Sequence, residues 1–372
     1  MKYYIIAGEA SGDLHGANLM RAIMAHDSDA EIRFWGGDAM QAVGGTMVKH
    51  IKDLAYMGFI EVMLHLKTVL GNISFCKKDI VAFNPDAIIY IDYPGFNLKI
   101  EKFAKAKGFR NFHYISPQLW AWKKGRIKNM RRDQDRLYYI LPFEQQFYKD
   151  NDFPQALFVG HPLLDEVGQF KKTQSQTDGK PIVALLPGSR KQEVAKMLPE
   201  MLKVVNLHPE FQFVIAGMSL LGAEFYKNVI KKPLENIDIW YDKTYELLTS
   251  AHAALVCSGT ATLETALFNV PQVVCYKANA LSIAIARYFV GKRVKYISLV
   301  NLIADKPIVT ELIQNDFNTQ TLDNEFMKVA QEGVARERML FGYKELRNLL
   351  GNEGASERVA TDIIKQINPY SK

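Results

Sequence analysis

The stretch IVALLPGSRKQEV at residues 182–194 constrains the fold more than any other part of the sequence. Four apolar residues predict a buried strand, a Pro-Gly pair ends it, and apolar residues then recur at helical spacing over residues 191–207. Such a turn brings unpaired N–H groups and the positive end of a helix to one point, which suits an anion. Gly188, Ser189 and Arg190 stand in the turn, and the permanently charged guanidinium of Arg190 suits phosphate. Taken alone, an ordinary turn with Arg190 on the surface explains the stretch equally well.

The same order of strand, turn and helix recurs along the chain. Strands are predicted in the first half at residues 3–7, 31–36, 87–91, 111–115 and 137–140. In the second half they are predicted at residues 182–186, 212–216, 237–241, 253–257 and 272–276. Helical patterns or loops lie between them, so each half is predicted to be α/β, with a parallel sheet covered on both faces.

A polar stretch at residues 168–181 is expected to link the two halves. We therefore predict two doubly wound, Rossmann-like domains, at residues 1–168 and 180–350. Such domains face a cleft at the carboxyl ends of their strands, where these folds bind ligands. The amphipathic helix at residues 355–368 is expected to cross back to the first domain.

Composition narrows the class of protein. A chain of 372 residues with 48% hydrophobic residues fits a globular enzyme of two domains. No apolar run approaches the roughly 18 residues of a membrane span, and we expect no signal peptide before the first strand. Cys76, Cys257 and Cys275 are far apart and form no CxxC motif, so we expect a cytoplasmic protein. The net charge of +6 suits an anionic substrate or a membrane surface and is too small to indicate nucleic acid.

A second glycine turn, SGTATLE at residues 258–264, follows directly on a predicted strand. The small residues Ser258, Gly259 and Thr260 let a diphosphate approach the backbone at the start of the next helix. Glu264 lies further along that helix. Its carboxylate can accept hydrogen bonds from a ribose diol, or it can serve only as a helix carboxylate near the positive end.

Asn301 stands in an apolar stretch that shows no helical period. Its amide can hold a phosphate or a sugar hydroxyl, or it can bond to its own backbone in a loop. Together with the turns at residues 188–190 and 258–264, Asn301 predicts a nucleotide diphosphate site in the second domain.

Asp92 ends a predicted strand and enters the Pro-Gly turn DYPG. A carboxylate at such a strand end can accept a proton from an attacking hydroxyl, or it can form an Asx turn. The first glycine turn, GEASGD, lacks the full GxGxxG spacing of a dinucleotide site. Its residues can orient a sugar or phosphate of the acceptor, or cap the following helix. They are Gly8, Glu9, Ser11, Gly12 and Asp13.

Three further polar residues carry weaker signals. A lone histidine such as His161 is more often structural than catalytic. Asp133 and Asp135 resemble the DxD motif that binds metal and nucleotide in some glycosyltransferases. They lie behind a basic helix outside the nucleotide domain, which favours a solvated pair. We therefore predict neither a metal nor a cofactor.

Two surface features of the first domain favour contact with a membrane. Residues 56–70 are rich in large apolar side chains, and the expected contacts there are Met57, Phe59, Ile60, Met63 and Leu64. Residues 120–132 place aromatic residues beside cations, with Lys123, Lys124 and Arg126 as expected contacts. A core helix and a solvated basic helix are the respective alternatives.

These segments together resemble one known family, in order and over nearly the whole chain. They are GEASGD (8–13), MGFIEV (57–62), DYPGFN (92–97), ISPQLWAW (115–122), LPFE (141–144), GHP (160–162), LLPGSRKQEV (185–194), SGTATLE (258–264) and SLVNL (298–302). They are similar to the lipid-A-disaccharide synthases. The resemblance implies an inverting glycosyltransferase with the GT-B fold. It would join UDP-2,3-diacylglucosamine to 2,3-diacylglucosamine 1-phosphate, releasing UDP and a β-1,6 disaccharide phosphate.

The resemblance also implies roles for individual residues. Asp92 would be the general base, while Arg190, Glu264 and Asn301 would serve the nucleotide. Some relatives carry a second Asp where this chain has Gly95, so Asp92 is the remaining carboxylate in that turn. The enzyme would be peripheral on the cytoplasmic face of the inner membrane.

Other functions suit the same turns. The alternatives are a UDP-GlcNAc epimerase, a lipid-linked GlcNAc transferase and a non-catalytic protein that binds nucleotide sugars or lipids. The apolar stretch at residues 56–70 favours a lipid-linked acceptor over an epimerase's single soluble substrate. The oligomeric state stays open between a monomer and a homodimer.

Overall fold

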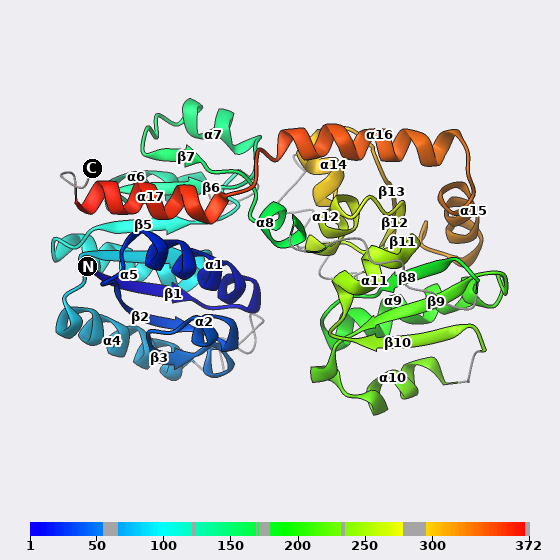
Figure 1. Cartoon of the computed structure of the whole chain (residues 1–372), viewed down its shortest axis with the longest axis horizontal. Coiled ribbons are helices and arrows are strands. Elements are labelled where there is room, and N and C mark those ends of the chain that lie inside the picture. The colour runs from blue at the N-terminus through cyan, green and yellow to red at the C-terminus, as the bar shows by residue number, and fades with distance from the viewer. Residues whose placement is uncertain are drawn as a thin grey trace. The chain divides into compact units, whose positions relative to one another are not determined.

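The computed structural model describes residues 1–54, 66–120, 124–168, 170, 179–231, 235–277 and 295–368. The chain forms two compact units (Figure 1), one of Met1–Pro162 with Asn352–Lys372 and the other of Leu163–Gly351. Each unit is built on a parallel sheet with helices, which confirms the predicted fold class. The division falls after Pro162, so residues 163–168, expected in the first domain, lie in the second unit.

In the first unit, the described strands form one parallel sheet in the order β3-β2-β1-β4-β5-β6-β7. The strands are β1 (Lys2–Ala7), β2 (Glu31–Gly36), β3 (Thr46–His50), β4 (Ala87–Ile91), β5 (Asn111–Tyr114), β6 (Arg136–Tyr139) and β7 (Ala156–Phe158). The α-helices are α1 (Ala10–His26), α2 (Asp38–Val43), α4 (Leu66–Phe83), α5 (Pro94–Ala106), α6 (Ile127–Asp133), α7 (Glu144–Asp150) and α17 (Ala355–Ile367). The strand order reverses between β1 and β4, and this is the point where doubly wound sheets bind ligands.

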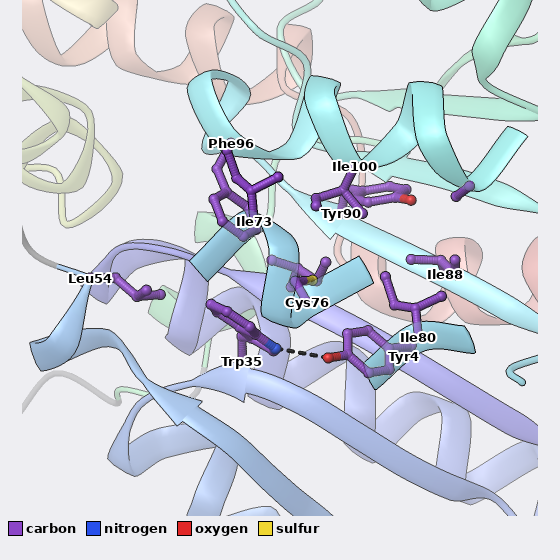
Figure 2. Close-up of a cluster of buried hydrophobic side chains, with 12 residues drawn as sticks. Tyr4, Trp35, Leu54, Ile73, Cys76, Ile80, Ile88, Tyr90, Phe96 and Ile100 are labelled. Carbon is purple, nitrogen blue, oxygen red and sulfur yellow. Dashed lines mark hydrogen bonds between the residues drawn. The ribbon is translucent and has the colours of Figure 1, made fainter. Parts of the chain in front are cut away.

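Buried side chains from β1, β2, β4, α4 and α5 pack together in the first unit (Figure 2). The Trp35 indole N–H donates to the Tyr4 hydroxyl at 2.8 Å, and that hydroxyl donates to Asp79 at 2.7 Å. Asp79 also pairs with Arg33 at 2.6 Å. The polar groups of Trp35 and Tyr4 are therefore satisfied within the apolar cluster, which avoids the cost of burying them unpaired.

Helix α17, from the end of the chain, packs against α1 in the first unit. Asp362 of α17 accepts a hydrogen bond from the Tyr138 hydroxyl at 2.8 Å. Among the described residues, no helix is both long and apolar enough to cross a membrane.

In the second unit, the described strands form a parallel sheet in the order β10-β9-β8-β11-β12-β13. The strands are β8 (Ile182–Leu186), β9 (Gln212–Gly217), β10 (Ile237–Tyr241), β11 (Ala251–Cys257), β12 (Gln272–Tyr276) and β13 (Thr310–Ile313). The α-helices are α8 (Leu163–Gly168), α9 (Lys191–Val205), α10 (Ala223–Ile230), α11 (Thr244–Ser250), α12 (Thr260–Leu267), α14 (Leu299–Ala304), α15 (Thr319–Ala330) and α16 (Val334–Leu349). Because β8 and β11 are neighbours, the two glycine turns that follow them come to the same edge of the sheet.

Candidate functional site

A cavity of about 400 Å³ opens in the second unit at the carboxyl ends of β8 and β11. The residues predicted to bind the nucleotide line it, apart from Asn301. They are Gly188, Ser189, Arg190, Ser258, Gly259, Thr260 and Glu264. Other residues line the cavity that were not predicted from the sequence, among them Glu193, Met218 and Thr244, because they lie beyond the glycine turns themselves. The structure therefore brings both turns to one cavity.

The turn before α9 differs from its prediction in one respect. The N–H groups there were predicted to be unpaired, but the Glu193 carboxylate accepts from the N–H groups of Ser189 and Arg190 at 3.2 and 3.3 Å. The Arg190 guanidinium donates to the same carboxylate at 2.9 Å. Gly188 has φ +112°, and a Cβ there would lie 2.7 Å from a Glu193 oxygen. Glycine is therefore required for the carboxylate to lie over the turn.

The turn before α12 is open instead. Among the described residues, no side-chain hydrogen bond caps this helix, and no atom lies within 4 Å of the position of a Cβ on Gly259, which has φ +157°. Thr260 and Ala261, the first residues of the helix, line the cavity. The Ser258 hydroxyl donates to the Ile297 carbonyl at 2.8 Å, which ties the turn to the chain before α14. The N-terminus of α12 therefore offers its backbone donors to an anion in the cavity.

Glu264 lies half-buried on the cavity wall, next to a tyrosine that the sequence analysis did not identify. The Tyr245 hydroxyl lies 2.9 Å from Glu264 Oε1 and 3.3 Å from Glu166 Oε2. Burial and these two carboxylates raise the pKa of Tyr245, so its hydroxyl stays protonated and can orient Glu264.

Asn301 does not line the cavity, which corrects its predicted role. It lies in the short helix α14 and is 1% exposed. Its Nδ2 donates to the Val309 carbonyl and to Glu311, both at 2.9 Å. Its Oδ1 accepts from the N–H groups of Ile308 and Val309 at 2.7 and 2.9 Å. The amide therefore fastens the chain between α14 and β13.

Asp92 follows β4 in the first unit, with φ +45° and its N–H bonded to the Tyr114 carbonyl at 3.0 Å. An Asx turn would use the N–H of residue 94, and Pro94 has none. Burial raises the pKa of Asp92 above its usual value; His113 and His15 oppose this, while Glu9 adds to it. A carboxylate with a raised pKa is a better general base near neutral pH.

The first glycine turn divides into structural and exposed residues. The buried Asp13 carboxylate accepts from the N–H groups of Gly37, Ala39 and Met40 at 2.6, 3.0 and 3.1 Å. Asp13 therefore caps α2, which corrects its assignment to the acceptor. The Tyr93 ring covers Gly8, and a Cβ at Gly8 would overlap that ring.

The remaining residues of this turn lie at the start of α1. Glu9 and Ser11 are exposed, whereas Gly12 packs in ordinary contact with Ala7 and Ile91. Glu9 is thus the turn residue whose charge acts on Asp92.

The structure also shows the surroundings of His161, Asp133 and Asp135, the residues with weaker signals in the sequence. Burial and neighbouring His15 lower the pKa of His161 to about 3, so its ring is neutral at physiological pH. Asp133 is 5% exposed, with both oxygens bound by Arg132 at 2.6 and 2.7 Å, and Asp135 pairs with Lys105 at 3.0 Å, which corrects the expected solvated pair. Within the described ranges, no group of three or more His, Cys, Asp or Glu side chains is placed to hold a metal ion.

Most of the predicted membrane contacts lie outside the described residues. These are Met57, Phe59, Ile60, Met63, Leu64, Lys123 and the side chain of Lys124. Arg126 is described and lies half-buried just before α6.

Comparison with known proteins shows the family to which the chain is similar. The model of the lipid-A-disaccharide synthetase family matches residues 3–361. A lipid-A-disaccharide synthase from Syntrophus aciditrophicus is 39% identical over 370 residues, covering 96% of this chain and 95% of the relative.

Two solved structures share the fold. The glycotransferase of kitacinnamycin has a TM-score of 0.69 at 15% identity, covering 98% of this chain and 99% of that chain. The UDP-GlcNAc 2-epimerase of Neisseria meningitidis, bound to UDP-GlcNAc, has a TM-score of 0.68 at 12% identity, covering 98% of this chain and all (100%) of that chain. These likenesses agree with the predicted GT-B fold. Because the family model and the 39% identical relative both span nearly the whole chain, the chain belongs to the lipid-A-disaccharide synthase family and is a glycosyltransferase of lipid A biosynthesis.

Proposed function

We propose that this chain joins UDP-2,3-diacylglucosamine to 2,3-diacylglucosamine 1-phosphate. The products are UDP and the β-1,6-linked disaccharide 1-phosphate. The observation that carries this proposal is the cavity in which two glycine turns, Arg190 and Glu264 meet, since these groups suit a nucleotide diphosphate. Membership of the family supports the choice of acyl sugars.

In this proposal the reaction is a single in-line displacement with inversion. The acceptor's 6-oxygen attacks the anomeric carbon of the donor, and its proton passes to Asp92. The bond from that carbon to the β-phosphate oxygen breaks, and UDP leaves with the electron pair. The N-terminus of α12 and the Arg190 guanidinium stabilise the charge that develops on the diphosphate.

The test is to incubate the purified protein with both diacylated substrates and to detect disaccharide phosphate by mass spectrometry. We expect UDP release only when both sugars are present. Conversion of UDP-GlcNAc to its 2-epimer without an acceptor would support an epimerase instead. Binding of both ligands without turnover would support a non-catalytic protein that binds nucleotide sugars or lipids.

We predict that activity survives EDTA. Backbone donors at the start of α12 and the guanidinium of Arg190 supply the positive charge for the leaving diphosphate. Turnover should be measured in EDTA with and without added Mg²⁺ or Mn²⁺. A complete loss that Mg²⁺ or Mn²⁺ restores would contradict the prediction and would return Asp133 and Asp135 to consideration.

We further propose that α4 helps the enzyme to bind the cytoplasmic face of the inner membrane. Leu70, Phe75 and Val81 of α4 are 53%, 48% and 50% exposed. Lys67 and Lys78 are exposed on the same helix. Apolar side chains beside cations suit an anionic lipid surface, where each cation contributes about 1 kcal/mol. The helix also continues the apolar stretch that the sequence analysis assigned to the membrane.

This proposal predicts two separable effects on binding to anionic vesicles. Replacing Leu70 and Val81 with Ser should weaken sedimentation with vesicles at both low and high salt. Replacing Lys67 and Lys78 with Gln should weaken it mainly at low salt, because salt screens exposed charges.

Helix α16 offers a matched control for these variants. Val334 and Phe341 are 62% and 64% exposed there, and their replacement with Ser should leave vesicle binding unchanged. If the α4 variants sediment like the wild type at both salt concentrations, α4 is a solvated face and the membrane contact lies elsewhere.

A further inference from the structure

We propose that Glu193 competes with the donor's diphosphate for the N–H groups of the glycine turn at residues 188–190 and for the Arg190 guanidinium, and that it accepts hydrogen bonds from them whenever the cavity is empty. This inference rests on the proposed function, because it concerns the same cavity. It assigns a role in ligand exchange to a carboxylate that the sequence analysis did not single out.

The contacts of Glu193 are those expected of a phosphate. Its two oxygens accept from the N–H groups of Ser189 and Arg190 and from the Arg190 guanidinium, at 2.9–3.3 Å. Two backbone N–H groups at the start of a helix and one guanidinium also form a set of donors typical of anion sites. The carboxylate lies close over Gly188, where a Cβ would be 2.7 Å from one of its oxygens. An anion of the chain itself thus holds the position that the sequence predicts for phosphate.

Glu193 can also be displaced. Its side chain is 32% exposed and lines the cavity, so it is accessible to an entering ligand. A diphosphate that approaches Arg190 meets a carboxylate of like charge. Either the carboxylate rotates away and gives up its donors, or the diphosphate binds without them. Both outcomes weaken the binding of UDP and of UDP-sugars relative to a turn without the carboxylate.

Helix capping alone does not explain this arrangement. A capping box needs the glutamate to bond to the backbone N–H at the start of the helix. Glu193 does so, but it also pairs with the exposed, charged side chain of Arg190, and both residues line the cavity. The second contact neutralises the cation that is otherwise available to a phosphate. A competitor that returns when UDP leaves would speed product release, a step that limits turnover in many enzymes.

The test compares UDP, UMP and uridine as ligands of the wild type and of Glu193→Gln by isothermal titration calorimetry. Gln has about the same size as Glu and keeps a side-chain oxygen that can accept from the backbone N–H groups, but it carries no negative charge. We expect UDP to bind about tenfold more tightly to the variant, the net worth of one hydrogen bond to a charged group. UMP should gain less, and uridine, which has no phosphate, should bind with unchanged affinity.

Glu200→Gln is the matched control. Glu200 lies on the same helix and pairs with Lys203 at 3.0 Å, outside the cavity. Its replacement should leave the affinity for all three ligands unchanged. If Glu193→Gln does not fold, Glu193→Ala carries the same test, with folding checked by thermal unfolding.

The outcomes separate the inference from the proposed function. Unchanged or weaker UDP binding in a folded Glu193 variant would overturn the inference. A loss of uridine binding as well would show that Glu193 contacts the nucleoside instead. If the wild type binds no UDP, the proposed donor site itself is wrong.

Discussion

Replacing Asp92 with Asn should lower turnover by roughly 10²–10⁴-fold, because the amide cannot accept the proton of the attacking hydroxyl. The Asp92 carboxyl follows β4 at the point where the strand order of the first unit reverses. Its φ of +45° is rare for a residue other than glycine, and strained backbone of this kind gathers at functional sites. The measurement is the steady-state rate of disaccharide phosphate formation by the purified variant.

UDP affinity serves as the control for this variant. The proposed donor site is built from residues of the second unit, so calorimetry should give the same dissociation constant for the variant and the wild type. Near-normal turnover of Asp92→Asn would remove Asp92 from the mechanism.

The pH profile provides an independent check on Asp92. A general base must be ionised, so kcat/KM should fall as the pH is lowered through the pKa of Asp92. Burial raises that pKa above 3.8, so the fall should begin at a higher pH than for an ordinary aspartate. Glu9 adds to the raised pKa. In Glu9→Gln the acid limb should therefore move to lower pH, and an unmoved limb would mean that another group titrates.

Replacing Asn301 with Ala should destabilise the second unit rather than weaken ligand binding. The change removes the side-chain partners of the buried Val309 N–H and carbonyl, whereas Ile308 and Glu311 each lose one hydrogen bond and keep Lys306 and Ser298 as partners. Each such group costs on the order of 1–3 kcal/mol, so we expect a loss of about 3 kcal/mol in the free energy of unfolding. Urea titration followed by tryptophan fluorescence measures this loss.

Two comparisons distinguish a structural role of Asn301 from the nucleotide-binding role that was expected from the sequence. Asn324→Ala, on the exposed side of α15, should change stability by less than about 0.5 kcal/mol. The folded fraction of Asn301→Ala should bind UDP with an affinity within about twofold of the wild type, since Asn301 does not line the cavity. Normal stability combined with lost UDP binding would restore Asn301 as a ligand residue.

The main strands and helices could be predicted because their signals are local. Apolar runs bounded by glycine turns marked β1, β4, β8 and β11, and apolar residues at helical spacing marked α9 and α17. The short strands β3, β7 and β13 were missed. They are edge strands of the described sheets, and most of their residues are half-buried or exposed, so they form no apolar run of the kind that marks a buried strand.

The sequence by itself also determined where the candidate site would form. Parallel strands place their carboxyl ends at one edge, so turns that follow neighbouring strands must meet there. Arg190, Gly259 and Glu264 consequently line one cavity, although 74 residues separate the first from the last by their numbers in the chain. Asp92 was likewise located by its place after a buried strand.

Only the tertiary structure decided which polar groups remain available for a ligand. Asp13 caps α2, Asn301 fastens the chain before β13, and Glu193 accepts from the turn that the sequence left open for phosphate. A carboxylate or amide has the same chemistry in a ligand site and in a backbone cap. Its role is settled by the donors and acceptors that lie within about 3 Å of it. Those neighbours come from other elements and from side-chain rotamers, which spacing along the chain does not specify.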